Sequence, residues 1–174
     1  MITKEIASFS RAAHDGNLYC AKFPRSASGS LADLCISQGI FGYSWPKLYT
    51  GFKSIDDTRE DAQKVWKDGR KGARPTLTCF KHIIDNGFGL IWLKDKGLYY
   101  LCVTEGVYRS SCEYGPEITH YLDAQYYEVP DSRVPWSVRR APRNLMQPRY
   151  DEQLIGETWD IYRECAAHGC VMTF

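Results

Sequence analysis

The stretch that decides the fold is residues 97–143, GLYYLCVTEGVYRSSCEYGPEITHYLDAQYYEVPDSRVPWSVRRAPR. Two runs in it have the composition of β-strands, Leu98–Thr104 and Ile118–Val129, and a turn-rich arm joins them. The second run alternates between an apolar set and a mixed set of side chains, which is the period of two that a strand requires. We predict that both runs form the wall of a curled sheet. The stretch then ends in a tail rich in arginine and proline.

Working outward from this stretch, the preceding run Phe88–Lys94 (FGLIWLK) and the turn KDKG predict a hairpin with Leu98–Thr104. Two further short strands are expected at residues 18–23 and 40–45, and helical spacing of apolar residues predicts helices at 31–39, 55–66, 75–86 and 151–165. Residues 1–17 carry weak periodicity and are expected to form a cap or a frayed lead-in. The order of elements predicts one α+β domain over residues 1–174, with a core of about 18–145 and a C-terminal helix of about 151–167.

The composition is that of a globular protein with many aromatic rings. Apolar residues make up 44 % of the chain, charged residues 25 % and aromatic residues 14 %, with 12 Tyr and 5 Trp. The formal net charge is only +1, so any attraction for an anionic partner has to be local. The longest uncharged apolar run, residues 87–93, is far shorter than the ~20 residues of a membrane span. The N-terminus lacks the apolar segment of a signal peptide, so we expect a cytoplasmic protein without a membrane partner.

The seven cysteines favour reduced, buried thiols. They are scattered, their number is odd and no CxxC pair occurs, which argues against a disulfide framework and against a typical zinc site. Cys165, His168 and Cys170 form the tightest Cys/His cluster, but no fourth ligand is evident. We therefore expect neither a metal ion nor a cofactor.

The order of five motifs gives a resemblance to a known superfamily. GIFGYSW (39–45) is followed by CFKHIIDNGFGLIWL (79–93), GLYYLCVTEGVYR (97–109), ITHYLDAQYYEVP (118–130) and RVPWSVRRA (133–141). Over residues 18–145 this order resembles the PUA-like superfamily, near the EVE and YTH domains and their relatives in bacterial restriction and antiviral proteins. The chain departs from the pattern at Gly87-Phe88, where a Gly-Asp is common, at Cys102 and at Tyr43-Ser44-Trp45.

The resemblance implies a PUA-like (EVE-like) curled β-barrel with flanking helices. Such domains hold an extruded, often modified base of DNA or RNA between aromatic side chains at one end of the barrel, while basic residues grip the backbone. Carried over to this chain, the resemblance implies a nucleic-acid-binding site formed by Ser44, Trp45, Tyr108, Arg109, Arg133, Arg139, Arg140 and Arg143.

Each of these residues also has an ordinary structural interpretation. Trp45 would then be an aromatic plug of the core, and the Ser44 hydroxyl would bond to its own backbone. The arginines of residues 133–149 would form a solvated rim paired with Asp131 and Asp151. Lys64, Lys67, Arg70, Lys71 and Arg74 form a second basic patch, for which pairing with the acidic residues of the preceding helix is the favoured explanation.

The sequence carries no catalytic fingerprint. GxSxG, HExxH and a glycine-rich phosphate loop are all missing. Cys102, His120 and Asp123 are the one combination that folding could turn into a thiol site, but their spacing is uninformative, and His120 is expected to be a core histidine. We therefore predict a non-enzymatic reader of nucleic acid, in a defence, restriction or RNA-modification context. The alternative is a protein-interaction module, such as a small inhibitor or adaptor, whose partner is a protein.

Overall fold

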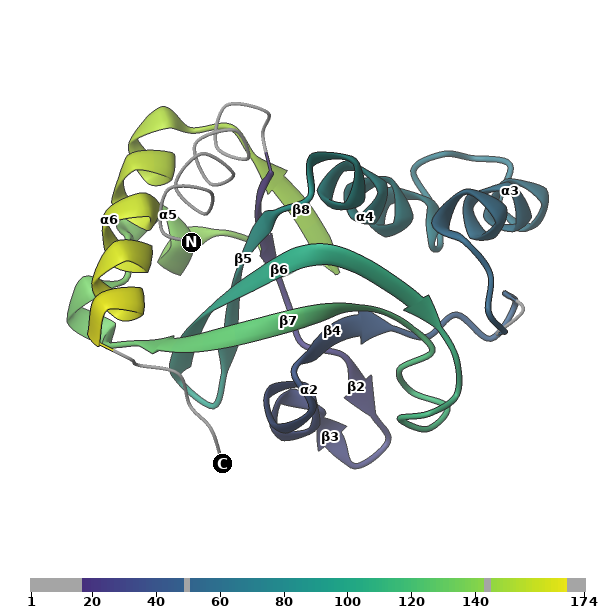
Figure 1. The fold of residues 1–174 in the computed structure, drawn as a ribbon, viewed down its shortest axis with the longest axis horizontal. Coiled ribbons are helices and arrows are strands. Elements are labelled where there is room, and N and C mark those ends of the chain that lie inside the picture. Colours follow the sequence, from purple (N-terminus) through teal and green to yellow (C-terminus); the bar gives the residue numbers. More distant parts are fainter. Residues whose placement is uncertain (1–16, 49–50, 143–144, 169–174) are drawn as a thin grey trace.

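The computed structural model describes residues 17–48, 51–142 and 145–168 (Figure 1). The strands are β1 (Leu18–Ala21), β2 (Arg25–Ser26), β3 (Gly29–Ser30), β4 (Ile40–Tyr43), β5 (Gly89–Asp95), β6 (Leu98–Ser110), β7 (His120–Val129) and β8 (Met146–Arg149). The helices are α2 (Ala32–Gln38), α3 (Ile55–Val65), α4 (Arg74–Asn86), the 3-10 turn η1 (Asp131–Arg133), α5 (Trp136–Arg140) and α6 (Glu152–His168).

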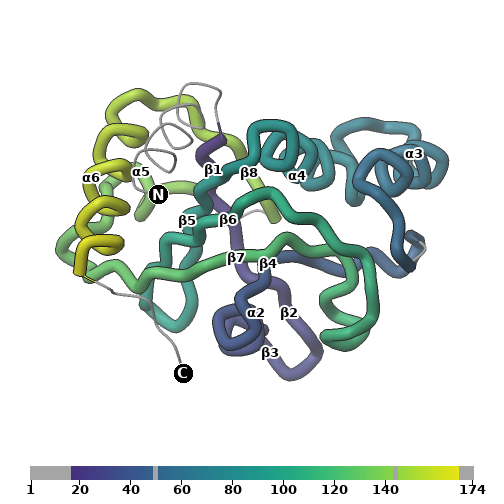
Figure 2. The backbone as a smooth tube through the Cα atoms, in the orientation of Figure 1, coloured from purple at the N-terminus to yellow at the C-terminus, as the bar shows by residue number. Residues whose placement is uncertain are grey.

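Six strands form one curled half-barrel sheet in the order β4-β7-β6-β5-β1-β8. β1 runs parallel to β5, and every other neighbouring pair is antiparallel. The chain passes from β1 through the small β2–β3 hairpin and α2, which lie beneath the sheet in Figure 2. The predicted α+β class, with a curled sheet and flanking helices, is confirmed.

The sheet is covered on both faces, and successive residues of its strands enter two different cores. Tyr19 and Ala21 of β1 pack into a first core with α2, α3 and α4. Leu18 and Cys20 of the same strand pack into a second core with α5 and α6. Successive side chains of a strand point to opposite faces of the sheet, and here both faces are buried. It explains why β1 has four buried residues in a row.

The helices begin where their sequences predict. Ser54 caps α3, its hydroxyl accepting a hydrogen bond from the Asp57 amide at 3.1 Å, and Asp56 and Asp57 lie in the first turn near the positive end of the helix. Pro75 lies in the first turn of α4, where its missing N–H costs nothing. The predicted C-terminal helix is present as α6, and a hydrogen bond from the Trp92 indole to the Thr158 hydroxyl (2.9 Å, buried) fastens it to β5.

The prediction that a strand ends at Thr104 and a turn follows was wrong. β6 continues to Ser110 through an irregularity, because Thr104 pairs with Ala124 but Tyr108 pairs with Leu122. Gly106 lies within this bulge at φ +80°, and a Cβ there would come within 2.9 Å of the Ile83 carbonyl oxygen in α4. Bulges bend a strand and re-aim the side chains that follow. Here the bulge lies against α4, and β6 passes beneath that helix in Figure 1.

Five elements were not predicted from the sequence: β2, β3, η1, α5 and β8. β8 has the sequence MQPR, which contains Pro148 and lacks β-branched residues, and it pairs only with β1. A proline is tolerated there because β8 is an edge strand, so the missing donor breaks no second ladder. The cap or lead-in expected for residues 1–16 lies outside the described residues. In the described parts of the chain, no helix combines the length and the apolar character that crossing a membrane would take.

Candidate nucleic-acid interface

A hollow of about 240 Å³ opens beside Trp45, where the ends of β1 and β4 meet the segment that leads into β8. We call it the Trp45 hollow, and define it by the residues that line it: Lys22, Phe23, Pro24, Arg25, Tyr43, Ser44, Trp45, Glu117 and Leu145. These residues come from four separate parts of the sequence. The hollow therefore exists only because the sheet brings those parts together.

Tyr43 holds the base of the hollow together. Its phenol oxygen lies 2.6 Å from the carbonyl oxygen of Lys22 and is also hydrogen-bonded to the carbonyl of Leu145. These contacts tie the residues after β1 and before β8 to β4. Burial raises the pKa of Tyr43 well above its usual value, so the phenol stays protonated and can donate.

The aromatic walls of the hollow are mostly packed into the first core. Trp45 is only 7 % exposed, and its ring centroid lies 6.0 Å from that of Tyr43 and 5.6 Å from that of His120. Phe23 packs against Tyr100 and Tyr126, with centroids 5.8 and 5.9 Å away. A ligand would meet the edges of firmly supported rings. Trp45 is therefore a core residue that also lines the hollow.

The mouth of the hollow is charged. The side chains of Lys22, Arg25 and Glu117 are exposed there, and Ser44 is half-buried. Among the described residues, neither Lys22 nor Arg25 has a carboxylate within ion-pair distance. The Ser44 hydroxyl accepts a hydrogen bond from the Thr119 hydroxyl at 3.2 Å. The hollow thus offers two cations, a carboxylate and a hydroxyl around aromatic edges.

Tyr108 lies within β6, not in the turn-rich arm predicted after Thr104, and it is partly buried. Its phenol oxygen lies 2.9 Å from Nδ1 of His120 and 3.0 Å from the Thr58 hydroxyl of α3. Its ring packs at 6.5 Å from Phe80 in the first core. Tyr108 is thus a link between α3 and the sheet behind Trp45.

His120 is a core histidine, as predicted. It has no exposed surface, and its Nε2 has no hydrogen-bond partner among the described residues. Burial lowers the pKa of His120 from 6.5 to about 4, so the ring is neutral at pH 7.

The arginines predicted to bind nucleic acid are largely occupied by carboxylates. Arg109 pairs with Asp123 at 3.1 Å, Arg133 with Glu164 at 2.8 Å and Arg139 with Asp131 at 3.0 Å. The guanidinium of Arg140 lies 5.5 Å from the ring of Trp136. The expected pairing of the tail with Asp131 is therefore present. Arg143 lies outside the described residues.

The arginine tail is also far from Trp45. Trp45 contacts His120 at the start of β7, whereas η1 and α5 follow Val129 at the end of that strand. Nine residue steps at ~3.3 Å place about 30 Å of strand between them. In Figure 1, α5 lies with α6 at the opposite end of β7. The structure joins Ser44 and Trp45 and brings none of the described arginines of the tail to them.

Sequence reasoning missed Lys22 and Arg25. The signal was present as two cations around the strand-ending segment Phe23-Pro24, but only the tertiary structure shows that this segment borders Trp45. In the second basic patch, Lys64 pairs with Asp61 of helix α3 at 3.3 Å, as predicted. Lys71 pairs instead with Asp68 of the loop at 3.8 Å, and Arg74 donates to the carbonyls of Trp66 and Lys67.

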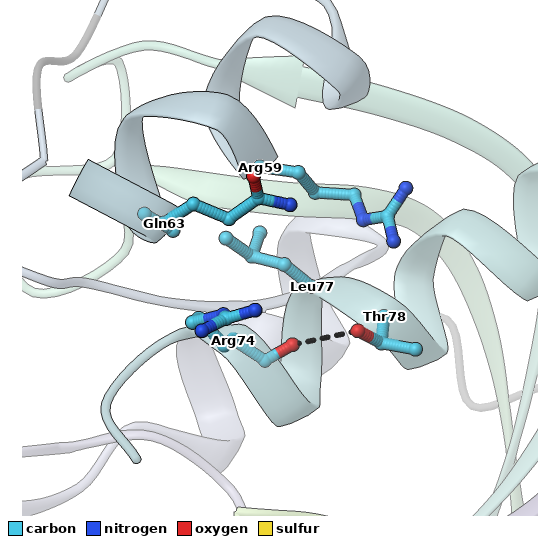
Figure 3. A pocket seen from close by; sticks show the side chains of 6 residues that line it. Arg59, Gln63, Arg74, Leu77 and Thr78 are labelled. Atoms are coloured by element: carbon cyan, nitrogen blue, oxygen red, sulfur yellow. Dashed lines mark hydrogen bonds between the residues drawn. The ribbon is translucent and has the colours of Figure 1, made fainter. Parts of the chain in front are cut away.

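A second, smaller hollow lies between α3 and α4 (Figure 3). It is lined by Arg59, Gln63, Arg74, Leu77 and Thr78, together with Ala62, and the Thr78 hydroxyl donates to the Arg74 carbonyl at 2.9 Å. The volume is about 30 Å³. Since one water needs at least ~10–15 Å³, this hollow has room for about two waters and no larger ligand.

The possible thiol site does not assemble. Cys102 is fully buried opposite Tyr126, six residues along β7 from His120, and Asp123 is paired with Arg109. Burial raises the pKa of the Cys102 thiol, so it is not a thiolate nucleophile.

As for a metal site, Cys170 of the Cys165/His168/Cys170 cluster lies outside the described residues. Within residues 17–48, 51–142 and 145–168, no three His, Cys, Asp or Glu side chains gather in a way that could hold a metal ion.

No family model, no curated protein and no solved structure matches this chain, so the resemblance to the PUA-like superfamily stays a prediction and the site rests on its own geometry.

Proposed function

We propose that this protein is a non-enzymatic nucleic-acid-binding module of the PUA-like kind that holds one base of a strand, unmodified or modified, in the Trp45 hollow. The observation that carries the proposal is the hollow itself, where Lys22 and Arg25, which form no ion pair with any described carboxylate, lie beside the edges of Phe23, Tyr43 and Trp45. The combination suits a ligand that is planar and apolar on its faces and anionic at its backbone.

The size of the hollow supports a ligand of one ring system. At about 240 Å³ it is below the ~300–1,000 Å³ of pockets for drug-sized molecules. It is also far larger than the water-sized hollow between α3 and α4. Removing a base from its stack costs a few kcal/mol, and contacts with ring edges return less than the ~1–3 kcal/mol of stacking on a ring face. Ring contacts alone do not offset that cost, so cationic contacts to phosphate have to supply the remainder.

The free cations supply those phosphate contacts. A guanidinium can bind phosphate through two parallel hydrogen bonds, and Arg25 needs to break no existing ion pair to do so. Arg139, in contrast, would first have to leave Asp131. With a net charge of +1, binding is expected to be weak and strongly dependent on salt.

The test is a binding panel of single-stranded and duplex oligonucleotides, with unmodified and modified bases, measured by fluorescence anisotropy at low salt. We expect Arg25→Glu to weaken binding by about tenfold or more, since it replaces a phosphate contact by repulsion. The matched control is Arg140→Glu, which makes the same change of charge at an exposed residue at the far end of β7, and it should leave binding close to that of the wild type. A panel in which no oligonucleotide binds, or in which only Arg140→Glu matters, would overturn the proposal.

The second candidate is a protein-interaction module. It is favoured by Phe52, whose side chain is fully exposed, and by Trp136 and Tyr150, which are 69 % and 71 % exposed. Co-purification of a stoichiometric protein partner without nucleic-acid absorbance, and loss of that partner in Phe52→Ser, would select this function over the first.

A further inference from the structure

A third hollow, of about 310 Å³, borders the Trp45 hollow. The two share Lys22, Phe23 and Arg25, so both border this segment. The other walls are Ser30 of β3 and residues 94–96, from the end of β5 and its turn into β6. We call this part the Lys94 hollow.

The residues that line the Lys94 hollow include four cationic ones, Lys22, Arg25, Lys94 and Lys96, and one acidic one, Asp95. The Lys94 ammonium lies 4.8 Å from the ring centroid of Tyr99, and no carboxylate of the described residues lies within ion-pair distance of it. The Lys96 ammonium reaches Asp33 at 4.0 Å, with both side chains largely exposed, and such a pair contributes little. The hollow therefore keeps a positive excess beside a site already proposed to hold a base.

The backbone conformation of Lys96 is an independent observation that favours a role for the positive charge of this residue in the hollow. Asp95 pairs with Leu98 across a two-residue turn, in which Lys96 has φ 47° and Gly97 φ 84°. Turns with two positive φ values favour Asn or Asp followed by Gly. A side chain such as lysine costs about 1–2 kcal/mol in this left-handed region. The turn itself gives no reason for a lysine at this position, whereas a cationic groove does.

We propose that the Lys94 hollow binds the phosphodiester backbone next to the base held in the Trp45 hollow, so that the ligand is a strand of at least two nucleotides rather than a free base or mononucleotide. Arg25 lines both hollows and would contact the phosphate between them, and Lys94 and Lys96 would contact the phosphates beyond. This inference rests on the proposed function and adds to it the direction in which the strand leaves the base site, towards the β5–β6 turn.

The test compares single strands of one, two and five nucleotides, each containing the preferred base, across a salt titration. Each phosphate contact on a single strand contributes about −0.7 to the slope of log K against log salt. The double substitution Lys94→Gln/Lys96→Gln should therefore make the slope for the five-nucleotide strand shallower by about 1.4 and weaken its binding about tenfold or more at moderate salt. Binding of the mononucleotide should not change.

The matched control is Lys67→Gln/Lys71→Gln, which removes two exposed charges from the loop between α3 and α4. It should leave both slope and affinity unchanged. If the wild type binds strands in an Arg25-dependent way but Lys94→Gln/Lys96→Gln behaves like the wild type, this inference is overturned while the proposed function stands. If Lys67→Gln/Lys71→Gln weakened binding equally, the effect would come from the overall charge of the protein, and this inference would also be overturned. If no strand binds the wild type at low salt, the proposed function fails and this inference fails with it.

Discussion

The phenol oxygen of Tyr108 lies 2.9 Å from Nδ1 of His120, and this contact joins the end of β6 to the start of β7 directly behind Trp45. The same oxygen is hydrogen-bonded to Thr58, so the contact also holds α3 against the sheet. The Trp45 hollow is thus supported from behind by a buried polar link between three elements.

We expect Tyr108→Phe to destabilise the protein by about 1–3 kcal/mol, because it leaves Nδ1 of the buried His120 without its partner. The Thr58 hydroxyl loses one hydrogen bond and keeps the one that it donates to the Ser54 carbonyl. Urea unfolding monitored by fluorescence measures the loss. The control is Arg109→Ala at the adjacent residue, which removes an exposed ion pair with Asp123 and should cost less than about 1 kcal/mol. Equal stability of Tyr108→Phe and the wild type would contradict this role.

The stability of the fold should fall as the pH drops from 6.5 towards 4. Burial lowers the pKa of His120 to about 4, from 6.5 in the unfolded chain. Between pH 6.5 and pH 4, His120 is therefore protonated in the unfolded state but neutral in the folded state. The contribution of the neutral His120 to the free energy of unfolding is fully present above pH 6.5 and is lost as the pH falls towards 4. The expected loss is about 2 kcal/mol between pH 7 and 5.

The measurement for this prediction is the urea midpoint at pH 7 and at pH 5, in the wild type and in His120→Gln. Gln does not titrate, so the variant reports the slope contributed by all other groups. The wild type should lose about 2 kcal/mol more than the variant. Identical slopes in the two proteins would show that His120 titrates normally.

Two glycine substitutions should change stability in opposite directions. A Cβ on Gly42 of β4 would come within 2.1 Å of the His120 carbonyl oxygen and 2.5 Å of Tyr121 Cβ, so Gly42→Ala has to push β4 away from β7. Such overpacking costs about 1–3 kcal/mol. Gly156 lies inside α6 with open space around it, and Gly156→Ala should stabilise by about 0.5–1 kcal/mol. Thermal unfolding compares the two variants, and a stabilising Gly42→Ala would contradict the close packing of β4 on β7.

Glu117 is expected to select which base the Trp45 hollow takes, provided that the hollow binds a base. A carboxylate only accepts hydrogen bonds, so it favours a base edge that presents N–H donors. Glu117→Gln should weaken binding of the donor-rich base about tenfold, within the ~1–3 kcal/mol of a good base contact, and spare the others. Competition among strands that differ in one base measures this. Tighter binding of all bases alike would instead show that Glu117 acts only through its charge.

Much of the fold could be predicted from the sequence, because the sequence patterns that specify its strands and helices are local. The period of two in 118–129, the proline after Phe23 and the helical spacing in 55–66 and 75–86 fix strands and helices through short-range sterics and the burial of one face. The end of β6 was misread, because the bulge at Gly106 depends on contact with α4, which lies about twenty residues earlier in the chain. β8 was not predicted for a similar reason. Its sequence has poor strand propensity, and it forms a strand because it pairs with β1, which is distant in the sequence.

The sequence by itself determined the α+β class, the elements of the central sheet, the buried His120 and the presence of Trp45 beside a strand end. Only the tertiary structure decided which charges are free. Carboxylates distant in the sequence neutralise Arg109 and Arg133, whereas Lys22 and Arg25 beside Trp45 pair with no carboxylate in the described part of the chain. The physical reason is that the charge environment of a side chain depends on which segments the sheet brings within a few ångströms of it, and local sequence patterns do not specify those segments.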